Sequence, residues 1–485
     1  MTLVVRSRAD LTLDAFQRVA WHSEPVILHA DAMARMREAR ATFERLLDDP
    51  DAYIYGVSSG YGQRASVRLS PEERREQAAR PSHVVRTSFG EPLPERITRG
   101  TVLARLANFV EGHAAVSPRI AEGVAAMLGG ARLPPVPALG NGCPGEIQAL
   151  SHLFIDLQQR ITLREKDALA LVNGSPCASA LVADAALAAR HRWGTATEVF
   201  ALAWEAMSAP LDHLDPALDG LWEDPYEART LAHLRDLVEG APGGRRRRYQ
   251  APVSWRIVPR VLGQALRAAA QAEEVAAISL RAVSDNPVFL PPDTEHPHGR
   301  AISTGGFHNA RAYPALDNLA AVWADVSLLC DRQLTKLLDG RVSELPDQLV
   351  TGPGVYLGCL GFAAAGYAEH ARHAAQRTFL PGSEGGGFGQ NDVSVPTFVA
   401  WRKAAEAGRC LDAALALLAL VASQAFFATE RAPPRRLRTL LKAVRAIAPP
   451  MTEPRALGPE AESLQRYLTA RAFEGCTVED SPRCT

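Results

Sequence analysis

The stretch AALALLALVASQAFFA, residues 413–428, indicates the fold of this chain most directly. Its hydrophobicity approaches that of a membrane span, but it is somewhat short, it contains Ser423 and Gln424, and it begins directly after Asp412. A buried helix of a bundle fits these features better. Helical periodicity rich in alanine and leucine recurs along the chain, at roughly residues 101–129, 180–207, 259–283, 312–339, 355–378 and 397–428.

Helices that are long and apolar on most faces must pack on one another or on neighbouring subunits. Because the alternation typical of strands is scarce, we predict a mostly α-helical protein, a bundle of long helices with oligomeric burial. We expect an N-terminal loop-rich and helical region at residues 1–205, a central long-helix bundle at 206–430 and a C-terminal helical tail at 431–485. The three regions are predicted to fold as one cooperative unit.

The amino-acid composition indicates which kind of molecule the protein binds and in which compartment it works. The chain has 485 residues, of which 47% are hydrophobic, so it can bury a large core. Its 53 Lys and Arg residues nearly balance 54 Asp and Glu residues, which argues against nucleic acid or an anionic membrane and favours a small molecule. The seven scattered cysteines are typical of reduced cytoplasmic thiols, and MTLVVRSRADLTLDAF at the N-terminus lacks the apolar segment of an export signal, so we expect a cytoplasmic protein.

Three polar segments have ordinary explanations. The arginine run at 245–248 is typical of a solvated loop, because the net charge is balanced. His296 and His298 lack a third ligand at a recognisable spacing, so we predict no metal site. GSEGGGFGQ at 382–390 lacks the lysine and the preceding strand that a P-loop needs.

The segment GNGCPGEIQALSHLF, residues 140–154, carries a thiol ahead of a predicted helix. Pro144 suits the first position of a helix, since it has no N–H to leave unpaired there. This places Cys143 at a helix N-terminus, where the positive end of the helix dipole favours a thiolate. Cys143 is therefore a candidate nucleophile, and the alternative is a buried cysteine that acts as a small hydrophobic residue.

The turn-rich segments, in their order and spacing, resemble the histidine and aromatic amino acid ammonia-lyase family from about residue 10 to the end. YGVSSGYG (55–62) is similar to the family's Tyr-Gly-Val-Asn-Thr-Gly-Phe-Gly, and LALVNGS (169–175) to Leu-Ala-Leu-Ile-Asn-Gly-Thr. Further similar segments are YQAPVSWRIVPRVLG (249–263), VSDNPVF (283–289) and STGGFHNARAYPALDNLA (303–320). The resemblance implies a mostly α-helical homotetramer of the fumarase/aspartase-like type, with each active site assembled from loops of three subunits.

In this family an Ala-Ser-Gly tripeptide cyclises into the electrophilic methylidene-imidazolone cofactor. Anchored on Leu150-Ser151-His152, the corresponding positions here are Cys143, Pro144 and Gly145. Ring closure requires the middle residue to lose its amide hydrogen and to eliminate a β-hydroxyl, and proline has neither. We therefore expect no methylidene-imidazolone and no other cofactor.

The resemblance also assigns roles to individual positions. Tyr55 falls on the catalytic tyrosine, Asn173 on an asparagine that contacts substrate and cofactor, and Arg256 on the arginine that pairs with the substrate carboxylate. The remaining substrate-binding positions that it implies are His83, Gln250, Phe307 and Gln390, of which His83 belongs to a segment whose register departs from the family spacing.

Other positions depart from the family pattern. Val253 stands where the family has a second tyrosine, Tyr356 replaces an asparagine, and Gln390 replaces a glutamate. These changes remove a proton carrier and a carboxylate from the expected site.

Together these features predict an ammonia-lyase-like enzyme without the methylidene-imidazolone. It would bind an amino-acid-like or carboxylate substrate through Arg256 and use Tyr55 as general base, with Cys143 as a possible nucleophile, for elimination, addition, cyclisation or acyl chemistry. One alternative is a non-catalytic ligand-binding or scaffold relative. A conventional ammonia-lyase ranks last, because without the electrophile the poor leaving group is not activated.

Overall fold

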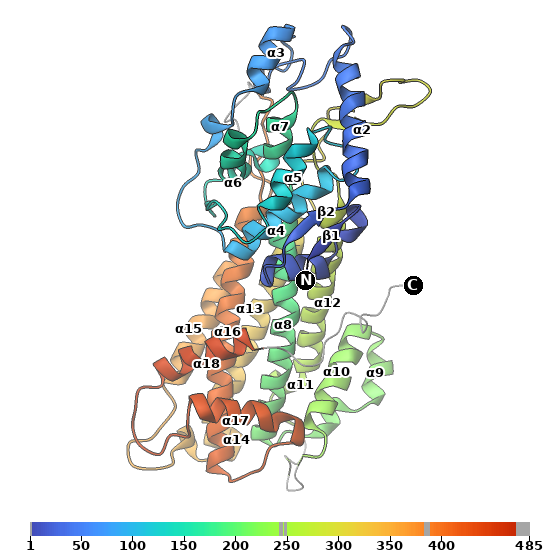
Figure 1. The fold of residues 1–485 in the computed structure, drawn as a ribbon. Helices are drawn as coiled ribbons and strands as arrows, with labels where there is room; N and C mark the ends of the chain where they lie inside the picture. Colours follow the sequence, from blue (N-terminus) through green and yellow to red (C-terminus); the bar gives the residue numbers. More distant parts are fainter. Residues whose placement is uncertain (1, 242–245, 247–249, 383–388, 472–485) are drawn as a thin grey trace. The chain divides into compact units, whose positions relative to one another are not determined.

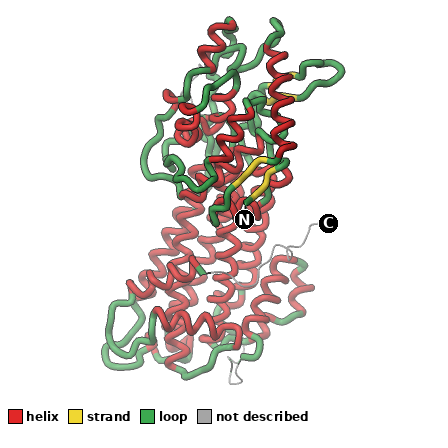
Figure 2. The backbone as a smooth tube through the Cα atoms, in the orientation of Figure 1, coloured by secondary structure: helices red, strands yellow, loops and turns green. Residues whose placement is uncertain are grey.

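A computed structural model describes residues 2–241, 246, 250–382 and 389–471 of the chain (Figure 1). Helix accounts for 62% and strand for 4%, which confirms the predicted mostly α-helical fold. The strands of the described part form two short pairs (Figure 2). β1 (Leu3–Val5) is parallel to β2 (Val26–Leu28), and β3 (Val288–Leu290) is antiparallel to β4 (Arg300–Ile302).

The chain folds into two compact units, each built from segments far apart in the sequence. The first unit comprises Met1–Leu187, Ala272–Leu316 and Thr378–Trp401. The second unit comprises Ala188–Gln271, Asp317–Arg377 and Arg402–Thr485. The predicted division of the sequence at residues 205 and 430 stays a prediction. The two compact units are defined by contacts between segments that are far apart in the sequence.

Four long helices confirm the alanine- and leucine-rich periodicity. They are α8 (Pro176–Met207), α12 (Val258–Arg281), α13 (Ala312–Leu338) and α16 (Thr397–Ala428). α16 has the predicted bounds, and α8 starts earlier than predicted because Pro176 suits the first helical position.

The other α-helices of the described chain are shorter. In the first unit they are α1 (Leu13–Phe16), α2 (Ala30–Leu47), α3 (Pro71–Ala78), α4 (Glu95–Arg105), α5 (Pro118–Ala126), α6 (Ile147–Arg160) and α7 (Asp167–Val172). In the second unit they are α9 (Ala217–Trp222), α10 (Pro225–Val238), α11 (Val253–Arg256), α14 (Gly340–Ser343), α15 (Leu360–Ala374), α17 (Arg438–Ile447) and α18 (Gly458–Ala470).

The helix predicted at 101–129 is wrong as one element, because two helices, α4 and α5, occupy that range. Between them the backbone takes positive φ at Gly112 (83°) and at Ala115 (51°), which no continuous helix allows. A Cβ on Gly112 would lie 2.5 Å from the Cβ of Ala39, so the break also depends on a close approach to α2. The helix predicted at 355–378 is shorter, since α15 covers Leu360–Ala374.

Two stretches are long and apolar enough to cross a membrane by length and composition, namely Asp167–Met207 and Thr397–Ala428. In both, 94% of the most apolar window is buried inside the protein. Burial of this extent is typical of core helices in a large helical domain. That the protein has no membrane partner stays a prediction.

In the second unit, the long helices are joined by buried polar contacts as well as apolar packing. Arg192 of α8 donates to Asp412 of α16 through Nε and Nη2, each at 3.0 Å from a carboxylate oxygen. The buried indole of Trp193 donates to the carbonyl of Leu262 on α12 at 3.0 Å. A two-pronged guanidinium–carboxylate pair is directional, so it sets the register of α8 against α16.

Candidate functional site

Tyr55 lies in a tight loop that its own serines hold in place. The backbone N–H of Ile54 donates to Ser58 Oγ at 2.6 Å, and that of Gly56 donates to Ser59 Oγ at 3.3 Å. Gly56 has φ of 68°, and a Cβ there would lie 2.6 Å from the ring of Tyr61, so only glycine fits. These contacts fix the backbone that carries Tyr55.

The hydroxyl of Tyr55 is also fixed. It accepts a hydrogen bond from the backbone N–H of Gly62 at 3.2 Å, and its half-buried ring meets the ring of Tyr61 edge to face, with centroids 6.5 Å apart. The arrangement leaves the Tyr55 oxygen in one defined position, as a proton-transferring group requires.

The segment 143–146 forms a helical turn, but this turn is not the start of α6. Pro144 occupies the first position of a 3-10 turn, Pro144–Glu146, as its missing N–H suggested. Gly145 and Glu146 then adopt left-handed φ values of 70° and 57°, and α6 begins at Ile147. The prediction that Cys143 lies at the N-terminus of the amphipathic helix is therefore corrected. The left-handed residues separate it from the α6 dipole.

Cys143 is half-buried, and burial raises the pKa of its thiol. Its backbone N–H donates to Gln148 Oε1 at 3.2 Å. A raised pKa lowers the thiolate fraction near neutral pH, which weakens the case for a nucleophile. The nucleophilic role stays a prediction.

This environment makes a measurable prediction about alkylation. We expect iodoacetamide to label Cys143 at least about tenfold more slowly at pH 7 than the exposed Cys359, because the thiolate is the reactive form and access is restricted. Peptide mass spectrometry against time measures both rates in one sample, and labelling in denaturant, where the two should react equally, is the control. Faster labelling of Cys143 than of Cys359 would show an activated thiol.

The 143–146 turn is held directly against Asn173, as the resemblance implied. The backbone N–H of Gly174 donates to the carbonyl of Gly145 at 3.1 Å. A Cβ on Gly145 would lie 2.5 Å from Asn173 Oδ1, so a side chain at position 145 would collide with the asparagine. Asn173 is buried, and its Nδ2 donates to the carbonyl of Asn286 at 2.8 Å.

Glu146 is a residue of this turn that sequence reasoning missed. Its side chain is buried, Oε2 accepts the N–H of Cys177 at 2.6 Å and Oε1 accepts the N–H of Ala178 at 2.8 Å. Burial raises the pKa of Glu146 to about 7, against the opposing effects of these N–H donors and of the Arg105 charge. Pro176 was the sequence feature that could have indicated this role of Glu146. A helix that begins at Pro176 has backbone amides in its first turn that need a hydrogen-bond acceptor.

Two buried cations, also missed, fix the ends of α7. Arg105 Nη1 donates to the carbonyls of Ala170 and Asn173, both at 2.7 Å. Lys166 Nζ lies 2.5 Å from Asp285 Oδ2. Burial lowers the pKa of both cations, and the charge of Asp285 opposes the effect in each case. Since Asn173 follows α7 directly, these contacts hold it at a set position.

Three other predicted residues of the first unit are not bonded to this cluster. His83 is exposed, with Nε2 at 3.3 Å from Gln159 Nε2, Phe307 is half-buried in a turn, and Gln390 is exposed. Within the described ranges, no hydrogen bond joins any of them to Tyr55, Cys143 or Asn173. Most of the glycine-rich segment before Gln390, residues 383–388, lies outside the described residues.

Arg256 and Gln250 belong to the second unit. Arg256 ends α11, and its Nε is buried without a hydrogen-bond partner among the described residues. Burial lowers the pKa of His213, and the positive charge of Arg256 lowers it further. His213 Nε2 accepts a hydrogen bond from the backbone N–H of Ala251 at 3.1 Å. Gln250, the other predicted residue of this unit, is exposed.

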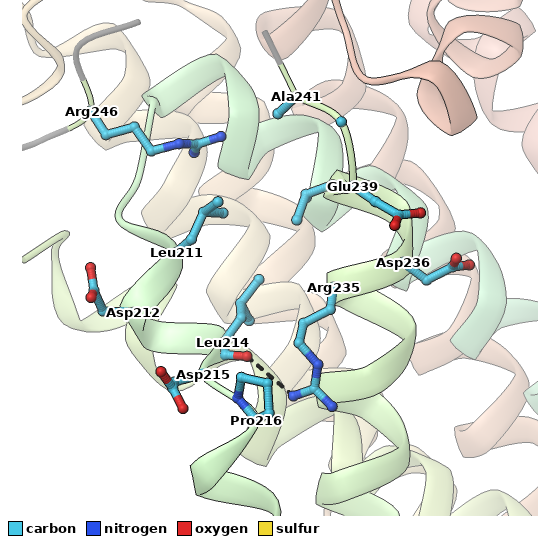
Figure 3. A pocket seen from close by; sticks show the side chains of 12 residues that line it. Leu211, Asp212, Leu214, Asp215, Pro216, Arg235, Asp236, Glu239, Ala241 and Arg246 are labelled. Atoms are coloured by element: carbon cyan, nitrogen blue, oxygen red, sulfur yellow. Dashed lines mark hydrogen bonds between the residues drawn. The ribbon is translucent and has the colours of Figure 1, made fainter. Parts of the chain in front are cut away.

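A cavity of about 680 Å³ opens elsewhere in the second unit (Figure 3), between the 211–216 segment and the end of α10. Its two arginines are already engaged. Arg235 donates to the carbonyl of Leu214 at 3.1 Å and pairs with Asp219, and Arg246 pairs with Glu205. None of the predicted site residues lines it, so its size alone does not make it the candidate site.

One group of metal-ligand type occurs in the described chain. Ligand atoms of His370, Glu406 and Cys410 lie within 4.8 Å of one another. Glu406 also pairs with Arg409, and burial raises the pKa of Cys410, and both effects oppose metal binding. The prediction that the protein holds no metal stays a prediction.

The chain is similar to known proteins over most of its length. The sequence pattern of the family described as aromatic amino acid lyase matches residues 11–159 and 155–446. A histidine ammonia-lyase from Deinococcus radiodurans is 29% identical over 502 residues, covering 95% of this chain and 93% of that protein.

Two solved structures share the fold. A tyrosine aminomutase from Streptomyces globisporus superposes with a TM-score of 0.84 at 23% identity, covering 97% of each chain. A histidine ammonia-lyase from Trypanosoma cruzi gives a TM-score of 0.84 at 22% identity, covering 96% of this chain and 93% of that one. The family pattern spans most of the sequence, and the fold matches over nearly its whole length. The chain therefore belongs to the aromatic amino acid lyase family.

Proposed function

We propose that this protein is a lyase-type enzyme that works without the methylidene-imidazolone and binds an amino-acid-like or carboxylate substrate. Arg256 would hold the carboxylate and Tyr55 would act as general base in an elimination, addition or cyclisation. The observation that carries the proposal is Pro144, which stands at the middle position of the cofactor-forming tripeptide.

The residues present do not fit the cofactor. The nitrogen of Pro144 is bonded to three carbon atoms, so it has no hydrogen to lose on ring closure, and the side chain has no hydroxyl to eliminate. The tripeptide Ala-Ser-Gly occurs nowhere in the 485 residues. No step of the proposed reaction therefore passes through an electrophilic prosthetic group.

The chain's own groups support binding and proton transfer. The buried Nε of Arg256, which has no hydrogen-bond partner among the described residues, is a donor that a substrate carboxylate would satisfy, and a planar guanidinium holds a carboxylate through two parallel bonds. The fixed hydroxyl of Tyr55 supports a role in moving a proton. The raised pKa of Cys143 makes acyl or other covalent thiol chemistry the less supported route.

The experiment that tests the proposal begins with ligand binding. Histidine, the aromatic amino acids and their deaminated carboxylates are screened for an increase in melting temperature, and the dissociation constant of each hit is measured. We expect Arg256→Ala to weaken binding about 100-fold and Arg256→Lys about tenfold, because lysine keeps the charge but loses the two-pronged geometry. Unchanged affinity in both variants would remove Arg256 from the site.

Turnover of a bound hit separates catalysis from binding. Tyr55→Phe should lower turnover by about 100-fold or more and change the dissociation constant by less than about threefold, since the ring stays and the proton-transferring oxygen is lost. Full turnover in Tyr55→Phe would contradict the general-base role. Ligands that bind but are never converted would favour a non-catalytic binding protein.

A second candidate is a conventional ammonia-lyase. It is favoured by the relatives, since proteins that are 29% identical over 95% of this chain are histidine ammonia-lyases. Purified protein lighter than its encoded sequence by two water molecules, with the loss located at residues 143–145, would establish this candidate and contradict the first.

The proposal includes a homotetramer in the cytoplasm. The resemblance to the family implies that loops of three subunits form each active site, so a monomer would lack part of the site. Light scattering of the purified protein measures the assembly, and a monomer at micromolar concentration would contradict this part of the proposal.

A further inference from the structure

A second cavity, in the first unit, is lined by positive charge. It has a volume of about 360 Å³, and its lining residues are Arg40, Ser117, Pro118, Arg119 and Arg164. All of its ionisable lining residues are arginines. The volume is within the range of small-ligand sites and far above the roughly 30 Å³ that one water molecule occupies.

Three elements form this cavity. Arg40 lies on α2, Ser117, Pro118 and Arg119 form the start of α5, and Arg164 lies between α6 and α7. α2 and α5 pack against each other (Figure 1). The floor is buried, since Arg40 and Ser117 are each 4% exposed, and the rim is formed by the exposed Arg119 and Arg164.

Two donors on the floor lack hydrogen-bond partners. Arg40 Nη2 and Ser117 Oγ are both buried, and neither makes a hydrogen bond of normal geometry to a described residue, while Ser117 Oγ lies beside the Asp167 carboxylate. Arg40 also forms two longer ion pairs, from Nη2 to Glu165 Oε2 at 3.9 Å and from Nη1 to Asp167 Oδ1 at 4.0 Å, and both distances are beyond hydrogen bonding. Buried donors normally have an acceptor, so an acceptor from outside the chain is the expected partner.

The N-terminus of α5 adds further positive potential. α5 has nine residues, Ser117 is its N-cap, and the Ser117 side chain caps no backbone amide of the helix. The first turn of a helix presents unpaired N–H groups and the positive end of the helix dipole, which favours anions.

The nearby carboxylates are engaged with the framework and do not line the cavity. Glu44 Oε1 accepts Arg40 Nε at 2.8 Å and Arg164 Nη1 at 2.9 Å. Asp167 accepts the N–H of Ser117 at 2.7 Å and that of Arg164 at 3.0 Å. These bonds hold the carboxylates beside the arginines, while the polar side chains that line the cavity are three arginines and one serine.

We propose that this cavity binds a tetrahedral oxyanion of the phosphate class, as inorganic phosphate or as the phosphate group of a small phosphate monoester. Three guanidinium groups and a hydroxyl offer more donors than the two oxygens of a carboxylate accept, whereas a phosphate carries up to two charges and more acceptor oxygens. Arg40 and Ser117 bind from the floor, and Arg119 and Arg164 close the rim. The site is separate from the residues assigned to catalysis and does not depend on the proposed function.

Calorimetric titration with inorganic phosphate, at constant ionic strength maintained with chloride, tests the proposal on the whole purified protein. We expect a dissociation constant below about 1 mM for the wild type and at least tenfold weaker binding in Arg119→Glu and in Arg164→Glu. Ser117→Ala should bind about threefold more weakly, because it loses one hydroxyl donor. Arg40 is left unchanged, since its Nη1 also donates to the carbonyls of Ala115 and Glu165 that hold α2 in place.

Arg160→Glu is the matched control, because it reverses the same charge at an exposed position at the end of α6. It should bind phosphate within about twofold of the wild type. A phosphate monoester such as glycerol phosphate, run in parallel, distinguishes the two sources, since the tighter binder of the two is the preferred ligand. No heat of binding up to about 10 mM phosphate, equal affinity in all variants, or acetate binding as tightly as phosphate would overturn the proposal.

Discussion

Replacing Pro144 with serine is expected to yield a protein lighter than its encoded mass by two water molecules. Serine supplies the amide hydrogen lost on ring closure and the hydroxyl lost on dehydration, and both are missing in proline. The Cys143 side chain lies outside the ring that would form, so it can stay. Gly145, whose nitrogen would attack the Cys143 carbonyl, is already in the tight left-handed turn that brings these groups together. Intact-protein mass spectrometry measures the loss, and peptide mapping locates it.

Pro144→Ala is the matched control for this substitution. Alanine also restores the amide hydrogen and relaxes the proline constraint, but it has no hydroxyl, so the second water cannot be lost. The wild type should have its full encoded mass. If Pro144→Ser kept its full mass too, the surroundings of the turn, and not proline alone, would prevent the cyclisation.

Removing the Glu146 carboxylate is expected to have the largest effect on stability. In Glu146→Ala, the N–H groups of Cys177 and Ala178 lose their acceptor inside the protein, and a cavity remains. Each unsatisfied buried donor costs about 1–3 kcal/mol, so we expect a loss of about 3–5 kcal/mol in the free energy of unfolding. Denaturant titration measures it, and Glu122→Ala, at an exposed position of α5, should change the same quantity by less than about 0.5 kcal/mol. A loss below about 1 kcal/mol for Glu146→Ala would show that the carboxylate is not needed to cap α8.

The same residue gives the stability a defined pH dependence. Burial raises the pKa of Glu146 to about 7 in the folded protein, whereas a glutamate in the unfolded chain titrates near about 4.3. Between these values the folded state holds more protons, so the contribution of Glu146 to stability is greatest at low pH and declines as pH rises to about 7. In Glu146→Gln the side-chain amide neither binds nor releases a proton in this pH range. The free energy of unfolding of the wild type relative to Glu146→Gln should therefore fall between pH 5 and pH 7, and a constant or rising difference would contradict the raised pKa.

The long helices could be predicted from the sequence because their signal is local. α16 has the bounds that its alanine and leucine content indicated, since helix propensity and burial act together along it. The prediction of one continuous helix at 101–129 was wrong, and the reason is also physical. Its apolar periodicity continues across a break that depends on left-handed backbone at Ala115, a conformation that a residue other than glycine seldom adopts and that its identity does not indicate.

The candidate site could be predicted only in part. Its motifs are short stretches of sequence, whereas the charged residues that support it bind partners far away in the sequence. Asn173 and the 143–146 turn lie together as the resemblance implied. Glu146, Arg105 and Lys166 were missed because each binds a partner far along the chain, at separations of 31, 68 and 119 residues. A charged residue whose partner is so distant looks like any solvated side chain until the fold brings the two together.

The pair formed by Arg192 and Asp412 bears on how the chain matures after synthesis. The partners are 220 residues apart, so α8 leaves the ribosome long before the helix that pairs with it. Until α16 is released, the apolar surface that it covers stays open to water and to other nascent chains. Contacts of such long sequence separation slow folding and lengthen exposure to aggregation. Molecular chaperones and low synthesis temperatures should therefore increase the yield of native protein more than they do for a helical protein built from neighbouring hairpins.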